Sequence, residues 1–249
     1  EHHYSQWTNN HYYRIAEKAN EYKIMVNSHE SVRPGGESRT YPNWISAEAA
    51  RGTEYDAFGG NNPDHHVILP FTRWMGGSMD YTPGIFQTKL DYYFPGDKRF
   101  VKTTLAKQLA LYVTMYMPLQ MAADLPENYA KHMDAFQFIK DVAADWDDTK
   151  ILSAEPGEYV HTARKAKGTD NWFVGGITDE NARDYTVDFS FLDKGRKYEA
   201  TVYEDGKDAD YITNPQSYKI YKKTVDSKTK LPIHLVRSGG YAISLKPVK

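Results

Sequence analysis

Residues 24–55 read IMVNSHESVRPGGESRTYPNWISAEAARGTEY. The stretch opens with the apolar run Ile24-Met25-Val26 and changes at Asn27 to polar residues that include His29 and Glu30. Buried parallel strands have this appearance when they deliver polar side chains to the mouth of a barrel or an open sheet. The stretch therefore predicts an α/β fold, and it places a candidate site at the end of this strand.

Three carboxylates, Glu30, Glu48 and Glu54, recur within this stretch. Acidic residues are most often solvated surface groups, so their number alone favours a surface role over a functional site by roughly two to one. Their neighbours argue the other way, because Glu30 follows an apolar strand and the other two lie among small residues that permit close packing. Buried carboxylates need arginine or metal partners. Paired carboxylates can cleave a glycosidic bond, and a carboxylate group can bind calcium; both interpretations stay open at this point.

Hydrophobic periodicity divides the chain into a helical part and a strand-rich part. Apolar residues at helical spacing predict helices over residues 5–22, 103–126 and 129–144. Pro42 and Gly52 favour a short helix over residues 42–51, and an apolar patch predicts another near Pro70. A polar segment at residues 145–148 ends this part. Beyond it, apolar and polar residues alternate and glycine-containing turns separate the runs, which predicts an antiparallel sandwich.

Composition excludes several classes of function. The chain has 249 residues, enough for a sizeable core, and 31 basic against 33 acidic residues, which argues against a nucleic-acid partner. The absence of cysteine excludes disulfides and thiolate metal sites. No run of 18 apolar residues occurs, so no membrane span is predicted. Because the chain begins at Glu1 without methionine and reads as if it started inside a helix, we expect it to be a piece of a longer protein.

Other candidate site residues have a simpler structural explanation. His65-His66 lies beside a loop, and a helix-start or surface pair is favoured over a zinc site by about four to one, since no third ligand is suitably spaced. For His29 two interpretations are equally favoured: its ring points into a site, or it forms a hydrogen bond with a backbone carbonyl. Asp80 could contact a ligand or cap the turn that follows it, and the cap is favoured.

The motifs of the chain, taken together, resemble those of one enzyme family. They are His29-Glu30, Arg33-Pro34, Arg39-Thr40-Tyr41-Pro42-Asn43, Glu48, Arg51-Gly52, Glu54-Tyr55, Leu69-Pro70-Phe71-Thr72-Arg73 and Met79-Asp80-Tyr81-Thr82-Pro83-Gly84. This combination resembles glycoside hydrolase family 97, the SusB-type α-glucosidases and α-galactosidases. The resemblance implies that residues 1–147 are the C-terminal half of a catalytic (β/α)8 TIM barrel and that residues 148–249 are an all-β antiparallel sandwich domain.

The resemblance also implies roles for individual residues. Glu54 would be the general acid that protonates the departing glycosidic oxygen, and Glu30 would be the general base that activates water. Glu30 and Glu48 would bind calcium (Ca2+), and His29 would contact the substrate. Inverting members resemble this chain in having glutamate after the histidine, whereas retaining members have a small residue there. Inversion needs the acid and base roughly 6.5 to 9.5 Å apart.

The function that the resemblance implies is that of an exo-acting, inverting and calcium-dependent α-glucosidase that cleaves α-glucosidic bonds of oligosaccharides. The alternatives are a retaining α-galactosidase of the same family and a non-catalytic carbohydrate-binding or scaffold module. The implied partners are an oligosaccharide substrate and the N-terminal portion of the same protein, namely a β-sandwich and the first half of the barrel. Without that portion we expect the chain to be an incomplete, inactive fragment. The resemblance also implies a periplasmic or secreted location.

Overall fold

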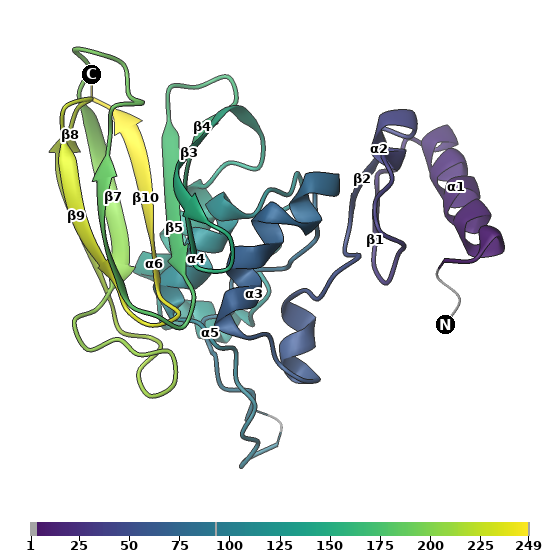
Figure 1. Cartoon of the computed structure of the whole chain (residues 1–249), viewed down its shortest axis with the longest axis horizontal. Coiled ribbons are helices and arrows are strands. Elements are labelled where there is room, and N and C mark those ends of the chain that lie inside the picture. Colours follow the sequence, from purple (N-terminus) through teal and green to yellow (C-terminus); the bar gives the residue numbers. More distant parts are fainter. Residues whose placement is uncertain (1–3, 93, 249) are drawn as a thin grey trace.

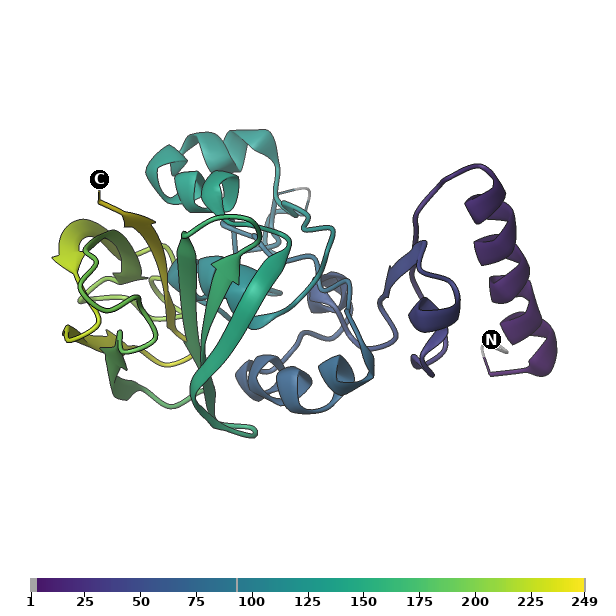
Figure 2. The same ribbon diagram turned by 90° about the horizontal axis from the view of Figure 1, so that it is seen from above.

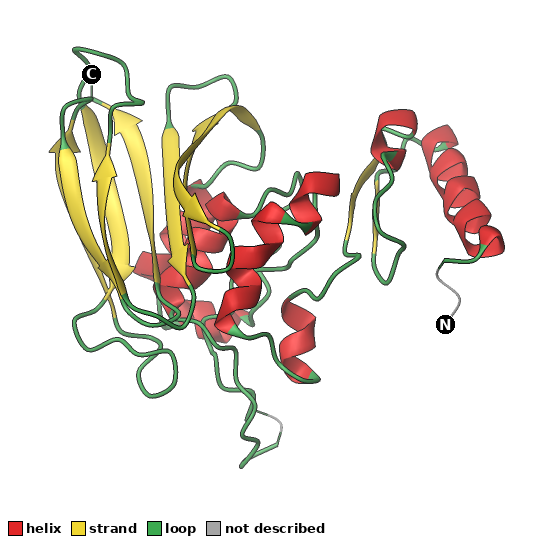
Figure 3. Cartoon of the chain, in the orientation of Figure 1, coloured by secondary structure: helices red, strands yellow, loops and turns green. Residues whose placement is uncertain are grey.

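The computed structural model describes residues 4–92 and 94–248, and these fall into two visibly different parts. A slender N-terminal part, residues 4–47, stands apart from the rest of the molecule in two perpendicular views (Figures 1 and 2). The remainder is a packed unit in which helices lie against β-sheets (Figure 3). No helix of the described residues is long and apolar enough to cross a membrane.

Helix α1 runs from Gln6 to Glu21, as its periodicity predicts. Ser5 caps its start, since the side-chain oxygen accepts a hydrogen bond from the Thr8 backbone N–H at 3.1 Å. The apolar face of this helix is packed in part, since the rings of Tyr12 and Trp44 lie 5.8 Å apart. Ala16 is the buried residue of the helix, and Trp7 is 69% exposed. The apolar stripe is therefore covered around Ala16 and exposed at Trp7 and Ile15.

Strands β1 (Val26–Ser28) and β2 (Trp44–Ala47) pair in parallel. An isolated parallel bridge between Ala47 and Met79 places a third segment beside β2. The carboxyl ends of these three parallel segments therefore lie at one edge, near residues 28, 47 and 79. The four-residue helix α2 (Glu37–Thr40) lies between the two strands in sequence.

Two sequence predictions for this part are wrong. Residues 42–51 hold strand β2 instead of a helix, because Trp44 and Ile45 favour extended backbone and the segment pairs with β1. The run before His29 is not buried either, since Ile24 and Met25 are 57% and 68% exposed. A parallel strand is buried when it has strands on both sides and helices on both faces of its sheet. Within the described residues, β1 pairs with β2 alone.

Short helical turns connect the parallel strands to the packed unit. They are η1 (Thr53–Ala57), α3 (Pro63–Ile68), η2 (Leu69–Phe71) and η3 (Arg73–Gly76). Pro63 occupies the first turn of α3, where its missing N–H leaves no helical hydrogen bond unmade. The helix predicted near Pro70 is thus a succession of short turns.

Helix α4 (Leu105–Thr114) lies at the centre of the packed unit, and all of its residues are buried. Thr104 caps it, because Thr104 Oγ1 accepts a hydrogen bond from the Lys107 backbone N–H at 3.1 Å. The helix is shorter than the predicted span of residues 103–126, since the backbone becomes extended at Met115.

Among the described residues, eight strands form two antiparallel sheets, in the orders β3-β4-β5-β10-β7-β8 and β6-β9. This arrangement confirms the strand-rich second half of the chain. The bounds of these strands and of the remaining helices are α5 Pro126–Ala130, α6 Met133–Asp141, β3 Trp146–Glu155, β4 Tyr159–Ala166, β5 Trp172–Thr178, β6 Arg183–Asp188, β7 Tyr198–Asp205, β8 Tyr218–Val225, β9 Lys230–Leu235 and β10 Gly240–Pro247.

The six-stranded sheet is covered on both faces. On one face, Val187 of β6 and Ile233 of β9 pack in one cluster with Val202 of the large sheet. Helices α4 and α6 lie on the other face (Figure 1), where Leu109 and Phe138 pack against the sheet. Helices from the first half of the chain therefore complete the core of the second half.

The predicted boundary between residues 147 and 148 falls inside β3. The division of the chain into domains at that point stays a prediction, because helices on the N-terminal side of it pack on the sheet that follows. The outer ends of the two predicted domains, residues 1–3 and 249, lie outside the described residues.

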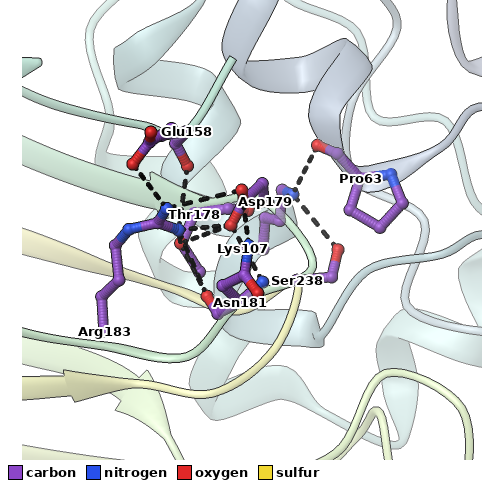
Figure 4. A network of polar contacts seen from close by, with 8 residues as sticks. All are labelled: Pro63, Lys107, Glu158, Thr178, Asp179, Asn181, Arg183 and Ser238. Atoms are coloured by element: carbon purple, nitrogen blue, oxygen red, sulfur yellow. Dashed lines mark hydrogen bonds and ion pairs between the residues drawn. The ribbon is translucent and has the colours of Figure 1, made fainter. Parts of the chain in front are cut away.

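A buried polar network ties α4 to the end of β5, to the loop before β10 and to α3 (Figure 4). Lys107 Nζ donates hydrogen bonds to Thr178 O at 2.8 Å, to Ser238 Oγ at 3.2 Å and to Pro63 O at 3.4 Å. Burial lowers the pKa of Lys107 to about 7, although nearby carboxylates, Asp179 first among them, oppose the shift. One side chain thus joins three segments that are far apart in sequence.

Candidate active site

Polar side chains follow the carboxyl ends of the three parallel segments. His29 and Glu30 follow β1, Glu48 follows β2, and Asp80 follows the bridge residue Met79. Functional residues of parallel barrels come from this end of the strands. The side chains of His29, Glu48 and Asp80 therefore meet at the strand end that the sequence indicates.

Glu48 lies at the centre of their contacts. Its Oε2 accepts a hydrogen bond from the Glu30 backbone N–H at 3.0 Å and lies 3.7 Å from His29 Nδ1. Arg73 fixes the local backbone, because its guanidinium donates to the carbonyl of Ala47 at 2.7 Å and to that of Glu48 at 3.1 Å. Burial lowers the pKa of Arg73 to about 10, so Arg73 stays positively charged near neutral pH.

Glu54 reaches the same place from the short helix η1. The Thr53 backbone N–H donates to Tyr81 O at 2.9 Å, which holds this turn against the segment that follows Asp80. Gly52 permits the close approach, since a Cβ at that position would lie 3.3 Å from Tyr81 O. The backbone at Glu54 is thereby fixed while its side chain remains exposed.

Three predicted site residues form one group. One ring nitrogen of His29 and one carboxylate oxygen each of Glu48 and Glu54 lie within 4.8 Å of one another. Glu30 is not a member of this group: its side chain is exposed, and its backbone adopts a left-handed conformation with φ of 49°. Its backbone N–H joins it to Glu48.

The group is acidic, and the charge of His29 responds to it. Burial lowers the pKa of His29, but the hydrogen bond to Asp80 and the charges of Glu48, Asp80 and Glu54 raise it by more. The pKa of His29 therefore lies above its ordinary value of 6.5. A protonated ring would place a positive charge beside the carboxylates.

The favoured expectation for Asp80, a cap on the following turn, is wrong. Asp80 is fully buried, and its Oδ2 accepts hydrogen bonds from Asn27 Nδ2 at 2.5 Å and from His29 Nε2 at 2.7 Å. A buried carboxylate needs donors from the protein interior, and these two side chains supply them. The same contact shows that His29 bonds to a side chain and not to a backbone carbonyl.

A second layer of buried polar residues supports the turn that carries Glu54, and sequence analysis missed it. The Asn61 backbone N–H donates to Asp56 Oδ1 at 2.8 Å, and its side chain donates to Gly52 O at 2.9 Å. Burial raises the pKa of Asp56 to about 6. His66 lies in α3, as a helix-start pair should, but it is buried against the Tyr81 hydroxyl at 2.5 Å. Such burial depends on contacts between distant segments.

The donor set fits part of a calcium shell. Calcium binds six to eight oxygen ligands, and Glu48 and Glu54 offer carboxylate oxygens close together. Imidazole suits softer metals better, and His29 Nε2 is already engaged by Asp80. The carboxylates of this group therefore suit a hard cation whose remaining ligands come from other residues or from water.

Two regions of this chain match models of one protein family. "Glycoside hydrolase 97" matches residues 2–50, and "Glycosyl-hydrolase 97 C-terminal, oligomerisation" matches residues 145–246. A retaining alpha-galactosidase of Bacteroides thetaiotaomicron is 37% identical over 239 residues, which cover 94% of this chain and 35% of that relative. The chain thus spans about a third of the relative's length.

Solved structures are similar over nearly the whole chain. A substituted glycoside hydrolase family 97 enzyme from Pseudoalteromonas sp. strain K8, in complex with panose, matches with a TM-score of 0.94 and 42% identity over 99% of this chain and 38% of that one. A family 97 enzyme of the same strain in complex with acarbose matches with a TM-score of 0.94 and 43% identity, over 99% of this chain and 38% of that one.

These superpositions confirm the predicted fold class, the C-terminal portion of a (β/α)8 barrel followed by an antiparallel β-sandwich. Separate models of one family match the two ends of the chain, and structures of that family match almost all of it. The chain therefore belongs to glycoside hydrolase family 97, and it spans the C-terminal part of the relatives it matches.

Proposed function

We propose that this chain carries part of the catalytic centre of an exo-acting enzyme that cleaves α-glucosidic bonds of oligosaccharides. The observation that carries the proposal is the convergence of His29, Glu48 and Glu54 at the carboxyl ends of parallel segments. Glycosidic cleavage needs paired carboxyl groups. Panose, an oligosaccharide of glucose, is bound in one of the similar structures, which supports an α-glucoside as the substrate.

In this proposal Glu54 is the general acid. The acid must reach the glycosidic oxygen, and the exposed side chain of Glu54 leaves it free to do so. Its backbone is held by the bond from Thr53 to Tyr81, so the carboxyl group is presented from a fixed turn. Proton transfer to the departing oxygen lets the leaving group depart as a neutral alcohol.

Glu30 is the general base in the same proposal. Its side chain is exposed, and its backbone N–H is anchored on Glu48 Oε2. Glu30 and Glu48 would also hold Ca2+, for which the exposed side chain of Glu30 would turn toward the group of His29, Glu48 and Glu54. This hard cation, when bound, would neutralise carboxylate charge and orient sugar hydroxyls. His29 would form a hydrogen bond with a sugar hydroxyl.

The residue after His29 bears on the stereochemical outcome. A glutamate at this position can activate water on the face opposite the leaving group, which predicts inversion. The relative described as a retaining alpha-galactosidase favours a second candidate, a retaining α-galactosidase. Proton NMR of the first-formed sugar, with aryl α-glucoside and α-galactoside offered separately, distinguishes the two.

The rest of the proposed centre would come from a further portion of the same protein. The chain spans 35% and 38% of the lengths of two similar proteins. Apolar side chains such as Trp7 and Met25 stand exposed on the N-terminal part, and exposed apolar surface of this kind marks an interaction site. The isolated chain should therefore not turn over an aryl α-glucoside.

We also propose a periplasmic or secreted location, which cell fractionation tests.

Replacing Glu54 with glutamine in the complete protein tests the proposed function. Loss of a general acid should lower kcat for an oligosaccharide by about 10²- to 10⁴-fold. The loss should be much smaller for an aryl glucoside whose phenolate leaves without protonation. Glu127→Gln, an exposed change on α5, is the matched control and should leave both rates unchanged. Equal losses on both substrates, or no loss, would contradict the role of Glu54.

A further inference from the structure

Asp80 is a buried charged residue that the proposed chemistry does not use. Its exposure is 0%, and its Oδ2 accepts from both Asn27 Nδ2 and His29 Nε2. Asp80 follows the bridge residue Met79, whereas both donors belong to β1 or the residues just after it. The contact therefore links the two outer segments of the parallel set across β2.

Stability alone gives a weak reason for this arrangement. A buried carboxylate loses its hydration, and well-packed apolar residues often replace buried ion pairs without loss of stability. Asp80 Oδ1 has no hydrogen-bond partner among the described residues, so even the desolvation of this group is incompletely offset. Such a group is better explained by what it does to its neighbours.

The contact decides how the ring of His29 is presented. An ionised carboxylate only accepts hydrogen bonds, so Nε2 of His29 must carry a proton and donate it to Asp80. Nδ1 is then turned toward Glu48, 3.7 Å away, on the side where Glu48 and Glu54 gather. A second hydrogen bond, from Asn27, restrains the carboxylate itself.

We propose that Asp80 is a positioning residue that fixes the tautomer and ring orientation of His29, with Asn27 as its support, so that Nδ1 of His29 meets a sugar hydroxyl at the catalytic centre. The proposal rests on the proposed function. A carboxylate behind a histidine fixes the outward nitrogen of the ring, as carboxylates do behind histidines that bind metals.

A double-mutant cycle in the complete protein tests this role. Asp80→Asn keeps the shape of the side chain but removes its charge and turns one oxygen into an NH2 group. We expect it to lower kcat/KM by roughly 10- to 100-fold in the His29 background, chiefly through KM. In a His29→Ala background the same change should alter kcat/KM by less than about twofold, because the residue through which it acts is gone. An activated aryl α-glucoside keeps the slow variants measurable.

Asn27→Ala is a second variant that leaves the charge of Asp80 in place. It should cause a loss in the same direction but smaller, and that loss should also vanish in the His29→Ala background. Equal losses in both backgrounds, for Asp80→Asn or for Asn27→Ala if the first does not fold, would overturn the proposal by showing a merely structural role. Its failure is separable from that of the proposed function, which Glu54→Gln tests independently.

Discussion

The two parts of the molecule differ in how completely they bury their apolar surface. The six-stranded sheet has β6 and β9 on one face and α4 and α6 on the other, and core residues such as Ile243 are fully buried. In the N-terminal part, by contrast, Ile24, Met25 and Trp7 are exposed, and of the two parallel strands β2 is mostly buried whereas β1 is only half-buried. Parallel sheets are stable when both faces are covered.

This contrast indicates that the packed unit folds on its own contacts, whereas the N-terminal part depends on contacts from outside this chain. Apolar burial is the main source of stability, so the packed unit should dominate the unfolding of this chain. The candidate site lies where the two parts meet, since His29 belongs to the slender part, Glu48 directly follows it and Glu54 comes from the next turn. The site's geometry therefore depends on the less covered part.

The largest expected effect concerns the cores of the two parts. Phe173→Ala on β5 should lower the free energy of unfolding by about 3–5 kcal/mol, because it leaves a cavity between the sheet and α6. Trp7→Ala should change it by less than about 0.5 kcal/mol in this chain, since the side chain is exposed. Urea unfolding followed by far-UV circular dichroism measures both. A large cost for Trp7→Ala would show that the N-terminal part is packed in solution after all.

A smaller effect is expected at the buried lysine. Lys107→Met should lower the free energy of unfolding by about 2–4 kcal/mol, because Thr178 O and Ser238 Oγ lose the donor that Lys107 supplies.

The same variant should also change the pH dependence of stability. Since burial lowers the pKa of Lys107 to about 7, the unfolded chain binds more protons than the folded chain between pH 7 and the ordinary lysine value of 10.5. The free energy of unfolding should therefore rise with pH across this window, by up to about 1.4 kcal/mol per pH unit. Urea titrations at pH 7.5 and 9 should show this rise in the original chain and a flatter dependence in Lys107→Met. Parallel pH profiles would contradict the assignment.

The smallest effect compares the two helix caps. Thr104→Ala removes the cap of the buried helix α4 and should cost about 1 kcal/mol. Ser5→Ala removes the equivalent cap of α1, and it should fray that helix without changing the main unfolding transition. Hydrogen exchange would detect the local fraying. If both changes shift the main transition equally, the two parts unfold together.

The sequence predicts the elements whose patterns are local. The spacing of apolar residues predicts α1 and the core of α4, and alternation predicts the strands from residue 185 onward. The end of α4 was harder, because apolar spacing continues to Leu119 although Pro118 disfavours helix at the residue before it. Strand β2 was missed because four residues carry little signal and its pairing with β1 is not local.

The candidate site was predicted in part for the same reason. Glu48 and Glu54 were found because their motifs are visible in the sequence, and the structure brings them together with His29. The burial of Asp80 and Asp56 could not be predicted, because it depends on segments that meet only in the folded chain. The position of Glu30 outside the group reflects a left-handed backbone that the sequence does not signal.

A double-mutant cycle on Glu48 and Glu54 tests most directly whether the gathered side chains act as one centre. The complete protein, Glu48→Gln, Glu54→Gln and the double variant would be compared by kcat/KM on one α-linked oligosaccharide of glucose, whose leaving group needs protonation. Residues that act as a unit are strongly non-additive, so the double variant should be about as slow as the slower single variant. Losses that multiply as for independent sites would contradict a shared catalytic centre.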